Sequence, residues 1–263
     1  MNHLKDVLRV ARGELLAPGP AAIGATVGLQ SDVRLLANSG LDFVLFDTQH
    51  SPFEIKELAP AIAQTHGTGA SPIVRVGDNR PELICYALDA GAKGIIVPMV
   101  NSAEEAERMI RACKYHPDGV RSNAGRRGDW GEFDSYREYM DTVNQELVII
   151  PMIETTEALE HIDEILEVPG IDVLLVGPSD LSIALDVPLD YENPKYIEAL
   201  DIIIGACRRH SVTPGMYFIP EQMEPSFFIE KGFGFCTVSW TEWATQGIQR
   251  GLEPLRGLYP AIQ

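Results

Sequence analysis

The feature that most constrains this fold is a repeated alternation of short apolar runs with longer amphipathic segments. The runs carry Val, Ile, Leu and Phe at consecutive positions, as parallel strands buried on both faces do. Eight such pairs favour a (β/α)8 barrel, with an open doubly wound sheet as the alternative. Strands are expected at residues 22–29, 41–47, 72–76, 94–98, 147–154, 172–177, 213–217 and 234–239. Helices are expected at residues 31–39, 52–64, 81–90, 103–115, 157–166, 194–210, 221–231 and 241–259.

A barrel of this kind takes roughly 250 residues. We therefore expect the 263-residue chain to form one barrel domain over residues 1–263. No GxGxxG or GxxxxGK[ST] motif follows a predicted strand, which argues against both nucleotide-binding folds. A longer insertion between the fourth and fifth strands contains Arg121, Arg126 and Arg127. These arginines indicate either a lid that meets an anionic substrate, or a solvated loop or subunit contact.

The charge balance of the chain limits the classes of partner that it can bind. Lys and Arg number 21 against 38 Asp and Glu, a net charge of −17, which argues against nucleic acid or an anionic membrane as a partner. No run reaches the roughly 20 apolar residues of a membrane span, and the first residues do not read as a signal peptide. Four scattered cysteines without a CxxC motif indicate buried apolar side chains in a reduced, cytoplasmic protein.

Polar side chains stand at the carboxyl ends of the predicted strands, where barrels carry their chemistry. Glu154 and Asp180 follow neighbouring strands. Such strands lie about 4.8 Å apart, so both carboxylates can reach one ion. Oxygen ligands without a thiolate or imidazole favour a hard cation such as Mg²⁺ or Mn²⁺. The alternative is two separately hydrogen-bonded carboxylates.

Two further strands carry candidate catalytic residues. His50 follows the second strand, three residues after Asp47, where it is either a general base or a hydrogen-bonded loop residue. Arg75 lies inside an apolar strand and needs an anionic partner. That partner can be a bound carboxylate or enolate, or else Glu154 or Asp47. No lysine stands at the carboxyl end of a strand, which argues against a Schiff-base mechanism.

Six sequence motifs occur in order along the chain. They are LDFVLFDTQHSP at 41–52, PIVRV at 72–76, KGIIVPMV at 93–100, YHPDGVR at 115–121, IET at 153–155 and VGPSDLS at 176–182. Over nearly the whole chain they resemble the HpcH/HpaI aldolases. These are metal-dependent class II pyruvate aldolases, including 4-hydroxy-2-oxo-heptanedioate and 2-keto-3-deoxy-sugar-acid aldolases. The resemblance implies a (β/α)8 barrel of the phosphoenolpyruvate/pyruvate type.

The resemblance also implies roles for individual residues. His50 matches the catalytic base, and Arg75 matches the residue that holds the pyruvyl oxygens and stabilises the enolate. Glu154 and Asp180 match the ligands of a divalent cation, either Mg²⁺ or Mn²⁺, with Co²⁺ as a further alternative. Ser179 matches a position whose backbone contacts the substrate.

An oligomer is a further implication. Asp89 matches an acid that raises the basicity of the catalytic histidine. Because Asp89 ends a predicted helix, it should lie at the far rim of the barrel and meet only a His50 from a neighbouring subunit. Family members are commonly hexamers that exchange a C-terminal helix, so the resemblance implies a homo-oligomer, either a trimer or a hexamer.

Three positions depart from the family pattern. Gln49 stands where the family has an acid before the histidine, and Met152 replaces a glutamine that contacts the substrate. A tryptophan common on the first strand is replaced near Thr26. The predicted metal ligands and base are kept, so these departures concern the substrate pocket.

Together these residues predict reversible retro-aldol cleavage of a 4-hydroxy-2-oxo acid to pyruvate, or a close analogue, and an aldehyde. His50 would take the 4-hydroxyl proton and the C3–C4 bond would break, while the cation and Arg75 stabilise the enolate. One alternative is a CoA-thioester lyase of the citrate-lyase or malyl-CoA-lyase type, whose basic cleft only the arginine-rich loop offers. The other is a non-catalytic 2-oxo acid binding protein, which Met152 and Gln49 keep open.

Overall fold

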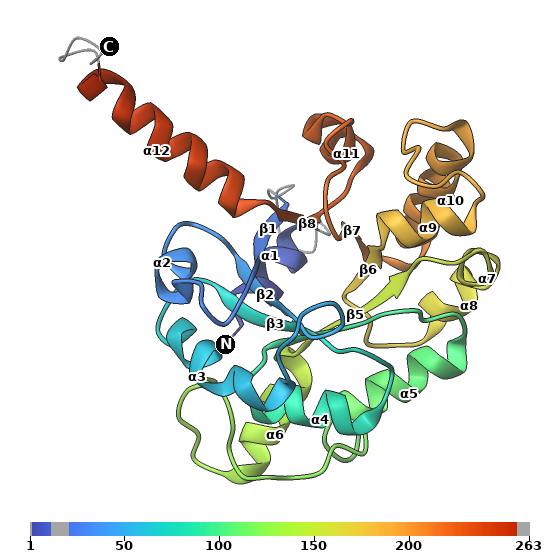
Figure 1. Ribbon diagram of the computed structural model, residues 1–263. Helices are drawn as coiled ribbons and strands as arrows, with labels where there is room; N and C mark the ends of the chain where they lie inside the picture. The colour runs from blue at the N-terminus through green and yellow to red at the C-terminus, as the bar shows by residue number, and fades with distance from the viewer. Residues whose placement is uncertain (1, 12–20, 257–263) are drawn as a thin grey trace.

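The computed structural model describes residues 2–11 and 21–256. Eight parallel strands form a closed barrel in which each strand pairs with the next along the chain, and β8 returns to β1 (Figure 1). The predicted (β/α)8 architecture is therefore confirmed. The strands are β1 Ala22–Val27, β2 Phe43–Asp47, β3 Ser71–Arg75, β4 Gly94–Val97, β5 Val148–Ile153, β6 Val173–Val176, β7 Thr213–Met216 and β8 Phe235–Val238.

Helices surround the barrel and depart in places from the predicted ranges. Pro60 lies in the first turn of α3, where its missing N–H is tolerated, and short 3₁₀ turns at Ile55–Glu57 and Ala63–Thr65 flank that helix. The segment predicted at 157–166 breaks at His161. Of the predicted last helix, residues 257–259 lie outside the described residues. The helices are α1 His3–Ala11, α2 Val33–Ala37, α3 Leu58–Ile62, α4 Pro81–Asp89, α5 Ala103–Cys113, α6 Tyr136–Glu146, α7 Thr156–Glu160, α8 Ile162–Glu167, α9 Pro178–Ala184, α10 Pro194–His210, α11 Pro225–Lys231 and α12 Trp240–Arg256.

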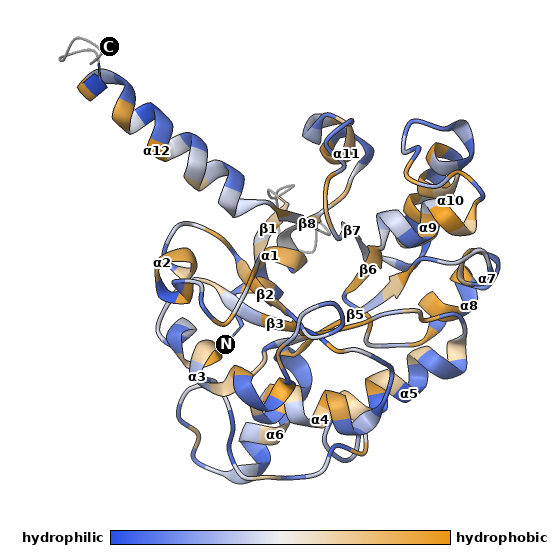
Figure 2. Cartoon of the chain, viewed as in Figure 1, coloured by the Kyte–Doolittle hydropathy of each residue, from blue (hydrophilic) through white to orange (hydrophobic). Residues whose placement is uncertain are grey.

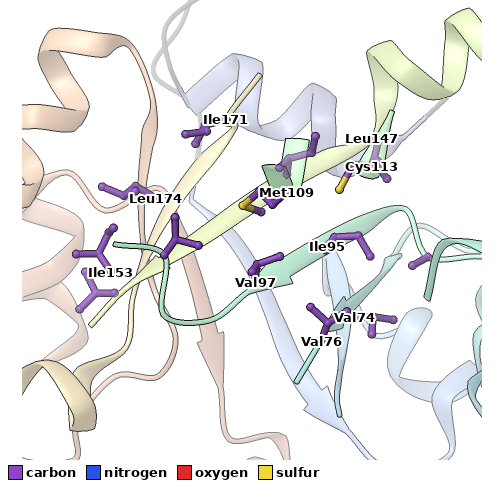
Figure 3. Packing of buried hydrophobic residues seen from close by; sticks show 14 of the residues in the cluster. Val74, Val76, Ile95, Val97, Met109, Cys113, Leu147, Ile153, Ile171 and Leu174 are labelled. Atoms are coloured by element: carbon purple, nitrogen blue, oxygen red, sulfur yellow. The ribbon is translucent and has the colours of Figure 1, made fainter. Parts of the chain in front are cut away.

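Two apolar cores follow from the alternation of side chains along each strand. The outer core packs strand residues such as Val74 and Ile95 against helix residues such as Met109 of α5 (Figure 3). The inner core fills the barrel and includes Leu4 and Leu8 of α1. Helix α1 therefore closes the amino-terminal end of the barrel.

The opposite end of the barrel interior is polar. Residues two apart on a strand share a face, so Asp47 and Arg75 continue the inward rows of Leu45 and Ile73. By the same alternation, the last inward positions of β1, β5 and β8 and the residue after β7 are Thr26, Met152, Thr237 and Tyr217. The alternating pattern thus brings these side chains to the carboxyl-terminal mouth of the barrel.

Helix α12 projects away from the barrel (Figure 1), and none of its residues is buried. Hydrophobic and hydrophilic residues are interspersed along it (Figure 2), and Trp243, Ile248 and Leu255 are exposed. The exchange of a C-terminal helix between subunits stays a prediction. Within the described parts of the chain, none of the helices combines the length and apolar character needed to cross a bilayer.

Candidate active site

Arg75 and Asp47 form a buried ion pair on the β2–β3 side of the mouth. Arg75 Nε donates to Asp47 Oδ1 at 2.9 Å, and Nη2 donates to Oδ2 at 2.6 Å. The guanidinium carbon lies 4.1 Å from the centre of the Tyr217 ring. The third nitrogen, Nη1, faces the sulfur of Met152 at 3.8 Å, which is a weak acceptor. Asp47 is therefore the anionic partner within the chain, and Arg75 retains N–H donors for a bound anion.

The electrostatics of this pair favour the ionised carboxylate. Burial acts to raise the pKa of Asp47, but the hydrogen bonds and charge of Arg75 outweigh it and hold that pKa below its usual value. The backbone N–H groups of Gln49 and His50 act in the same direction. Tyr217 also donates its hydroxyl to Asp47 Oδ2 at 3.3 Å. Burial raises the pKa of Tyr217 to about 12, so its hydroxyl remains a donor.

His50 lies on the loop directly after β2, and its side chain is exposed. Asp47 shapes this loop by accepting the backbone N–H of Gln49 at 2.9 Å. The Oε1 atom of Gln49 is buried and has no hydrogen-bond partner among the described residues. Asp47 therefore supports the loop through its backbone, and the His50 ring stays accessible for proton transfer.

Glu154 and Asp180 occupy the β5–β6 side of the mouth. Glu154 is 3% exposed, and its Oε1 accepts the backbone N–H of Met99 at 2.8 Å. Met99 has φ 54°, a left-handed conformation that is uncommon outside glycine. A Cβ at Gly177 would lie 2.2 Å from Glu154 Oε2, so only glycine leaves room for this carboxylate. Asp180 is exposed in the first turn of α9.

The Glu154–Asp180 side fits a hard divalent cation. Burial raises the pKa of Glu154 above its usual value; the hydrogen bond from the Met99 N–H opposes this, the charge of Asp180 adds to it, and the charge of Arg75 opposes it. The charge of Arg75 thus does not offset the effects of burial and of Asp180 on the Glu154 carboxylate. No group of three or more His, Cys, Asp or Glu in the described ranges could hold a metal. Mg²⁺ needs only one or two protein carboxylates, since substrate and water complete its shell.

Ser179 stands beside Asp180 in the first turn of α9, and its hydroxyl lies 3.4 Å from that of Tyr191. The backbone carbonyl of Ser179 accepts a hydrogen bond from Ser182 Oγ at 2.7 Å. Proline at the start of α9 suits the first turn of a helix, where an N–H has no acceptor. The turn therefore presents Ser179 and Asp180 beside the strand end that carries Glu154.

Asp89 is not near this mouth in its own chain. It ends α4, and Arg121 Nη2 binds its Oδ1 at 3.1 Å. The Arg121 guanidinium is buried, with its carbon 4.5 Å from the centre of the Tyr115 ring. Helix α4 returns from the carboxyl end of β3, so its own carboxyl end lies at the opposite rim. The expectation that Asp89 lies at the far rim is confirmed, and its approach to a neighbouring His50 stays a prediction.

The arginine-rich loop also lies at the amino-terminal rim. Asp129 accepts a hydrogen bond from the backbone N–H of Gly67, just before β3. The Lys93 ammonium group, just before β4, lies over the Trp130 ring. Arg121 is buried against Asp89 and is not available to a substrate. Within one subunit the loop and the mouth lie at opposite ends, so the loop does not cover its own active site. A lid that meets an anionic substrate in a neighbouring subunit, or a subunit contact, stays a prediction.

Three features of the mouth are absent from the sequence predictions. Tyr217 stacks on Arg75, Met99 supports Glu154, and the Trp240 indole N–H donates to the carbonyl oxygen of Thr26 at 3.1 Å. Trp240 thus contacts the strand from which the family tryptophan is missing. None of these three residues carries a charge, so they do not stand out among the charged groups at the strand ends. The position of Tyr217 directly after β7 could have indicated from the sequence that its ring lies at the mouth.

Known proteins resemble this chain in sequence and in fold. The model of the family described as HpcH/HpaI aldolase/citrate lyase matches residues 30–241. A 4-hydroxy-2-oxo-heptane-1,7-dioate aldolase of Klebsiella pneumoniae is 30% identical over 97% of this chain and 92% of that protein. A hydroxypyruvate/pyruvate aldolase of Roseovarius nubinhibens is 34% identical over 64% of this chain and 66% of that protein. The crystal structure of an HpcH/HpaI aldolase/citrate lyase family protein from Burkholderia cenocepacia covers 97% of this chain and 100% of its own, with 27% identity and a TM-score of 0.81.

Proposed function

The chain belongs to the HpcH/HpaI aldolase/citrate lyase family, and on this premise we propose that it reversibly cleaves a 4-hydroxy-2-oxo acid to pyruvate, or a close 2-oxo acid, and an aldehyde. The observation that carries the proposal is the asymmetry of the barrel mouth. On one side Arg75 offers an N–H donor that faces only the weak acceptor of the Met152 sulfur. On the other side, burial and the charge of Asp180 raise the pKa of Glu154. A 2-oxo acid has carboxylate and keto oxygens, which can accept hydrogen bonds from Arg75 and bind a cation.

A divalent cation held by Glu154 and Asp180, Mg²⁺ or Mn²⁺ with Co²⁺ as an alternative, would supply Lewis-acid stabilisation of negative charge on the substrate. Arg75 would donate N–H groups to the 2-oxo acid and hold the negative charge that develops when the C3–C4 bond breaks. Asp47 keeps the guanidinium in place through two hydrogen bonds. Tyr217 covers one face of the guanidinium and shields it from water.

His50 would act as the general base. It would take the proton from the 4-hydroxyl group, and the electrons of the C3–C4 bond would pass to the enolate of the 2-oxo acid. In the reverse direction it would return that proton as the new bond forms. Its exposure on the loop after β2 suits exchange with the aldehyde half.

Oligomerisation would complete this site. Asp89 would meet the His50 of a neighbouring subunit and raise its basicity, and Arg121 would hold the Asp89 carboxylate in place. We propose a homo-oligomer, a trimer or a hexamer, of single-barrel subunits that exchange α12. The exposed apolar residues of α12 support this proposal.

A cytoplasmic location is also proposed. All four cysteines lie within the described ranges and are free thiols. Burial raises the pKa of the Cys113, Cys207 and Cys236 thiols to about 12, which suits inert packing groups rather than redox or metal chemistry.

The test is an aldol assay with pyruvate and a panel of aldehydes. The protein is stripped with EDTA and then supplied with Mg²⁺, Mn²⁺ or Co²⁺. We expect product only with a divalent cation. Binding of pyruvate and cation without turnover, for every aldehyde and 2-oxo acid tried, would contradict the proposal and fit a non-catalytic binding protein.

A CoA-thioester lyase would need cations for the CoA phosphates. Within one subunit the arginine-rich loop lies at the opposite end of the barrel from the mouth, so only the loop of a neighbouring subunit could supply them. Tight CoA binding in the same assay would favour this alternative.

A further inference from the structure

A chamber lies between the connection that follows β7 and the start of α12, on the carboxyl-terminal side of the barrel. Its volume is about 690 Å³, which is the size of a site for a small organic molecule. In Figure 1 the segment leading to α11 rises between α12 and α10. Among the described residues that line the chamber, none is a proposed cation ligand, His50 or Arg75. The chamber is therefore separate from the proposed active site.

The charge of the chamber has one sign. Glu221, Glu224 and Glu242 line it with exposed side chains, and no Lys, Arg or His is among its lining residues in the described ranges. Glu242 accepts a hydrogen bond from the neutral amide of Gln246 at 3.1 Å, which leaves its charge in place. A hollow lined by one sign of charge raises the local concentration of ligands of the opposite sign. The chamber thus favours a cation.

A metal ion does not account for this charge. Within the part of the chain that the structure describes, no group of three or more His, Cys, Asp or Glu could hold a metal. The three carboxylates therefore do not converge on one small ion. Carboxylates that are spread over a chamber of this volume suit a larger cation, whose charge is carried on an organic body.

Aromatic and apolar side chains form the rest of the wall. Tyr191 and Phe218 meet edge to face, with ring centres 6.3 Å apart. Trp243 stands directly after Glu242 and exposes 54% of its surface, and Met223 adds apolar wall. The face of an aromatic ring attracts an ammonium group, and Trp does so most strongly. The same wall gives a carbon skeleton apolar surface on which to leave water.

Thr237 gives the chamber a buried polar group that lacks a partner. It lines the chamber near the end of β8 and is 3% exposed. Its Oγ1 atom has no hydrogen-bond partner among the described residues. A buried hydroxyl without a partner is unfavourable, so a ligand that bonds it gains affinity. Since a hydroxyl oxygen can accept a hydrogen bond, an amine N–H can supply the missing partner.

We propose that this chamber binds an organic cation, namely a protonated primary amine on an apolar or aromatic body. The glutamates would attract and hold the ammonium group, and Thr237 would accept one of its N–H groups. Trp243 and Phe218 would cover the carbon skeleton. The inference goes beyond the proposed aldolase function, because it adds a second ligand and does not depend on the reaction.

The test titrates the full-length protein with tyramine and with cadaverine, followed by calorimetry and tryptophan fluorescence. Mg²⁺ is present at saturation, so that amines do not compete for the proposed cation site. The matched controls are 4-ethylphenol, which is tyramine without its amine, and ammonium chloride, which lacks the carbon body. We expect saturable binding of both amines, about tenfold or more weaker binding of each control, and loss of affinity as salt rises.

Equal affinities for tyramine and 4-ethylphenol would overturn the proposal, because the charge would then have no role. Absence of saturable binding of either amine in the millimolar range would overturn it as well.

Variants locate the site. Glu221→Gln with Glu242→Gln should weaken tyramine binding about tenfold or more, and Thr237→Val about fivefold, whereas Thr237→Ser should keep wild-type affinity. The matched control is Glu107→Gln with Glu164→Gln, since both glutamates line a separate groove between α5 and α8. That variant should leave tyramine binding unchanged. Equal losses in the two double variants would show that the net charge of −17, rather than this chamber, attracts the amine.

A competition experiment separates the chamber from the mouth of the barrel. Saturating pyruvate should leave the affinity for tyramine within about threefold, because the two sites have no lining residue in common. Displacement of tyramine by pyruvate would place the amine in the mouth and overturn the proposal. Exchange of the pyruvate methyl protons is measured in the same preparation. Its absence, with Mg²⁺ bound, would overturn the proposed function and leave the amine site standing.

Discussion

Asp47 on the β2–β3 side of the mouth and Glu154 on the β5–β6 side are both buried carboxylates, with 6% and 3% of their surfaces exposed. Burial acts to raise the pKa of each. Arg75 reverses the effect for Asp47, while Asp180 reinforces it for Glu154. One side of the mouth is thus neutralised within the chain, and the other carries charge that a bound cation would compensate. We propose that both sides take part in the chemistry, and that the Asp47–Arg75 ion pair in addition fixes the guanidinium in place.

The largest expected effect is on the β5–β6 side. Glu154→Gln should lower turnover about 10³-fold, because a lost cation removes several kcal/mol of charge stabilisation. The variant should also weaken Mn²⁺ binding in a calorimetric titration. In metal-free protein its free energy of unfolding should equal or exceed that of wild type, since glutamine removes an uncompensated buried charge. Strong destabilisation of the metal-free Glu154→Gln variant would show that the charge of Glu154 is already compensated within the chain.

His50→Ala should lower turnover by about 10²-fold or more, which is the usual contribution of a general base. Mn²⁺ affinity should stay within about twofold of wild type, because the predicted cation ligands are kept. Full activity in steady-state assays would eliminate the role of His50 as base.

Asp47→Asn should lower the free energy of unfolding by about 3 kcal/mol, because it leaves Arg75 buried without an anionic partner. Urea denaturation measures the change. The matched control is Asp163→Asn, whose ion pair with Arg209 is half exposed, at 50% and 56%. That variant should cost at most about 1 kcal/mol. Equal effects of the two variants would show that burial does not set the difference.

The same pair sets a pH dependence of stability. The pKa of Asp47 is lower in the folded protein than its ordinary value of 3.8. Its stabilising contribution is therefore fully present above that value and is lost as pH falls through the lower, folded pKa. The difference in unfolding free energy between wild type and Asp47→Asn should shrink below about pH 4. A difference that stays constant under acid would contradict the assigned pKa direction.

The smallest effect is expected at Tyr217. Tyr217→Phe removes the 3.3 Å hydrogen bond to Asp47 but keeps the ring over Arg75, so it should cost about 1 kcal/mol of stability. Tyr217→Ala removes the stacked ring as well and should cost more. If thermal denaturation ranks the two variants in the opposite order, the stack on Arg75 has no stabilising role.

The fold could be predicted because each strand is a run of apolar residues buried on both faces. All eight strand positions agree with the structure to within two residues at each end. Helices α1, α6 and α9 lie outside the predicted ranges. Their apolar residues, such as Leu4, Tyr139 and Val143, are spread among polar ones, and their burial depends on what they pack against.

The site could be predicted only where charge stands at a strand end. Asp47, Arg75 and Glu154 are visible in sequence for that reason. The partner of Arg75 is set by the register in which Asp47 pairs with Arg75 across β2 and β3. Likewise, the Asp89–Arg121 pair joins residues that are 32 positions apart and depends on tertiary packing.

We propose that the mouth of this barrel forms an enolate from pyruvate with the help of a divalent cation. The most direct test is deuterium exchange of the pyruvate methyl group, followed by NMR, with Mg²⁺ or Mn²⁺ and then with EDTA. We expect exchange that requires the cation and that EDTA abolishes. Absence of exchange, with the cation shown to be bound, would contradict it.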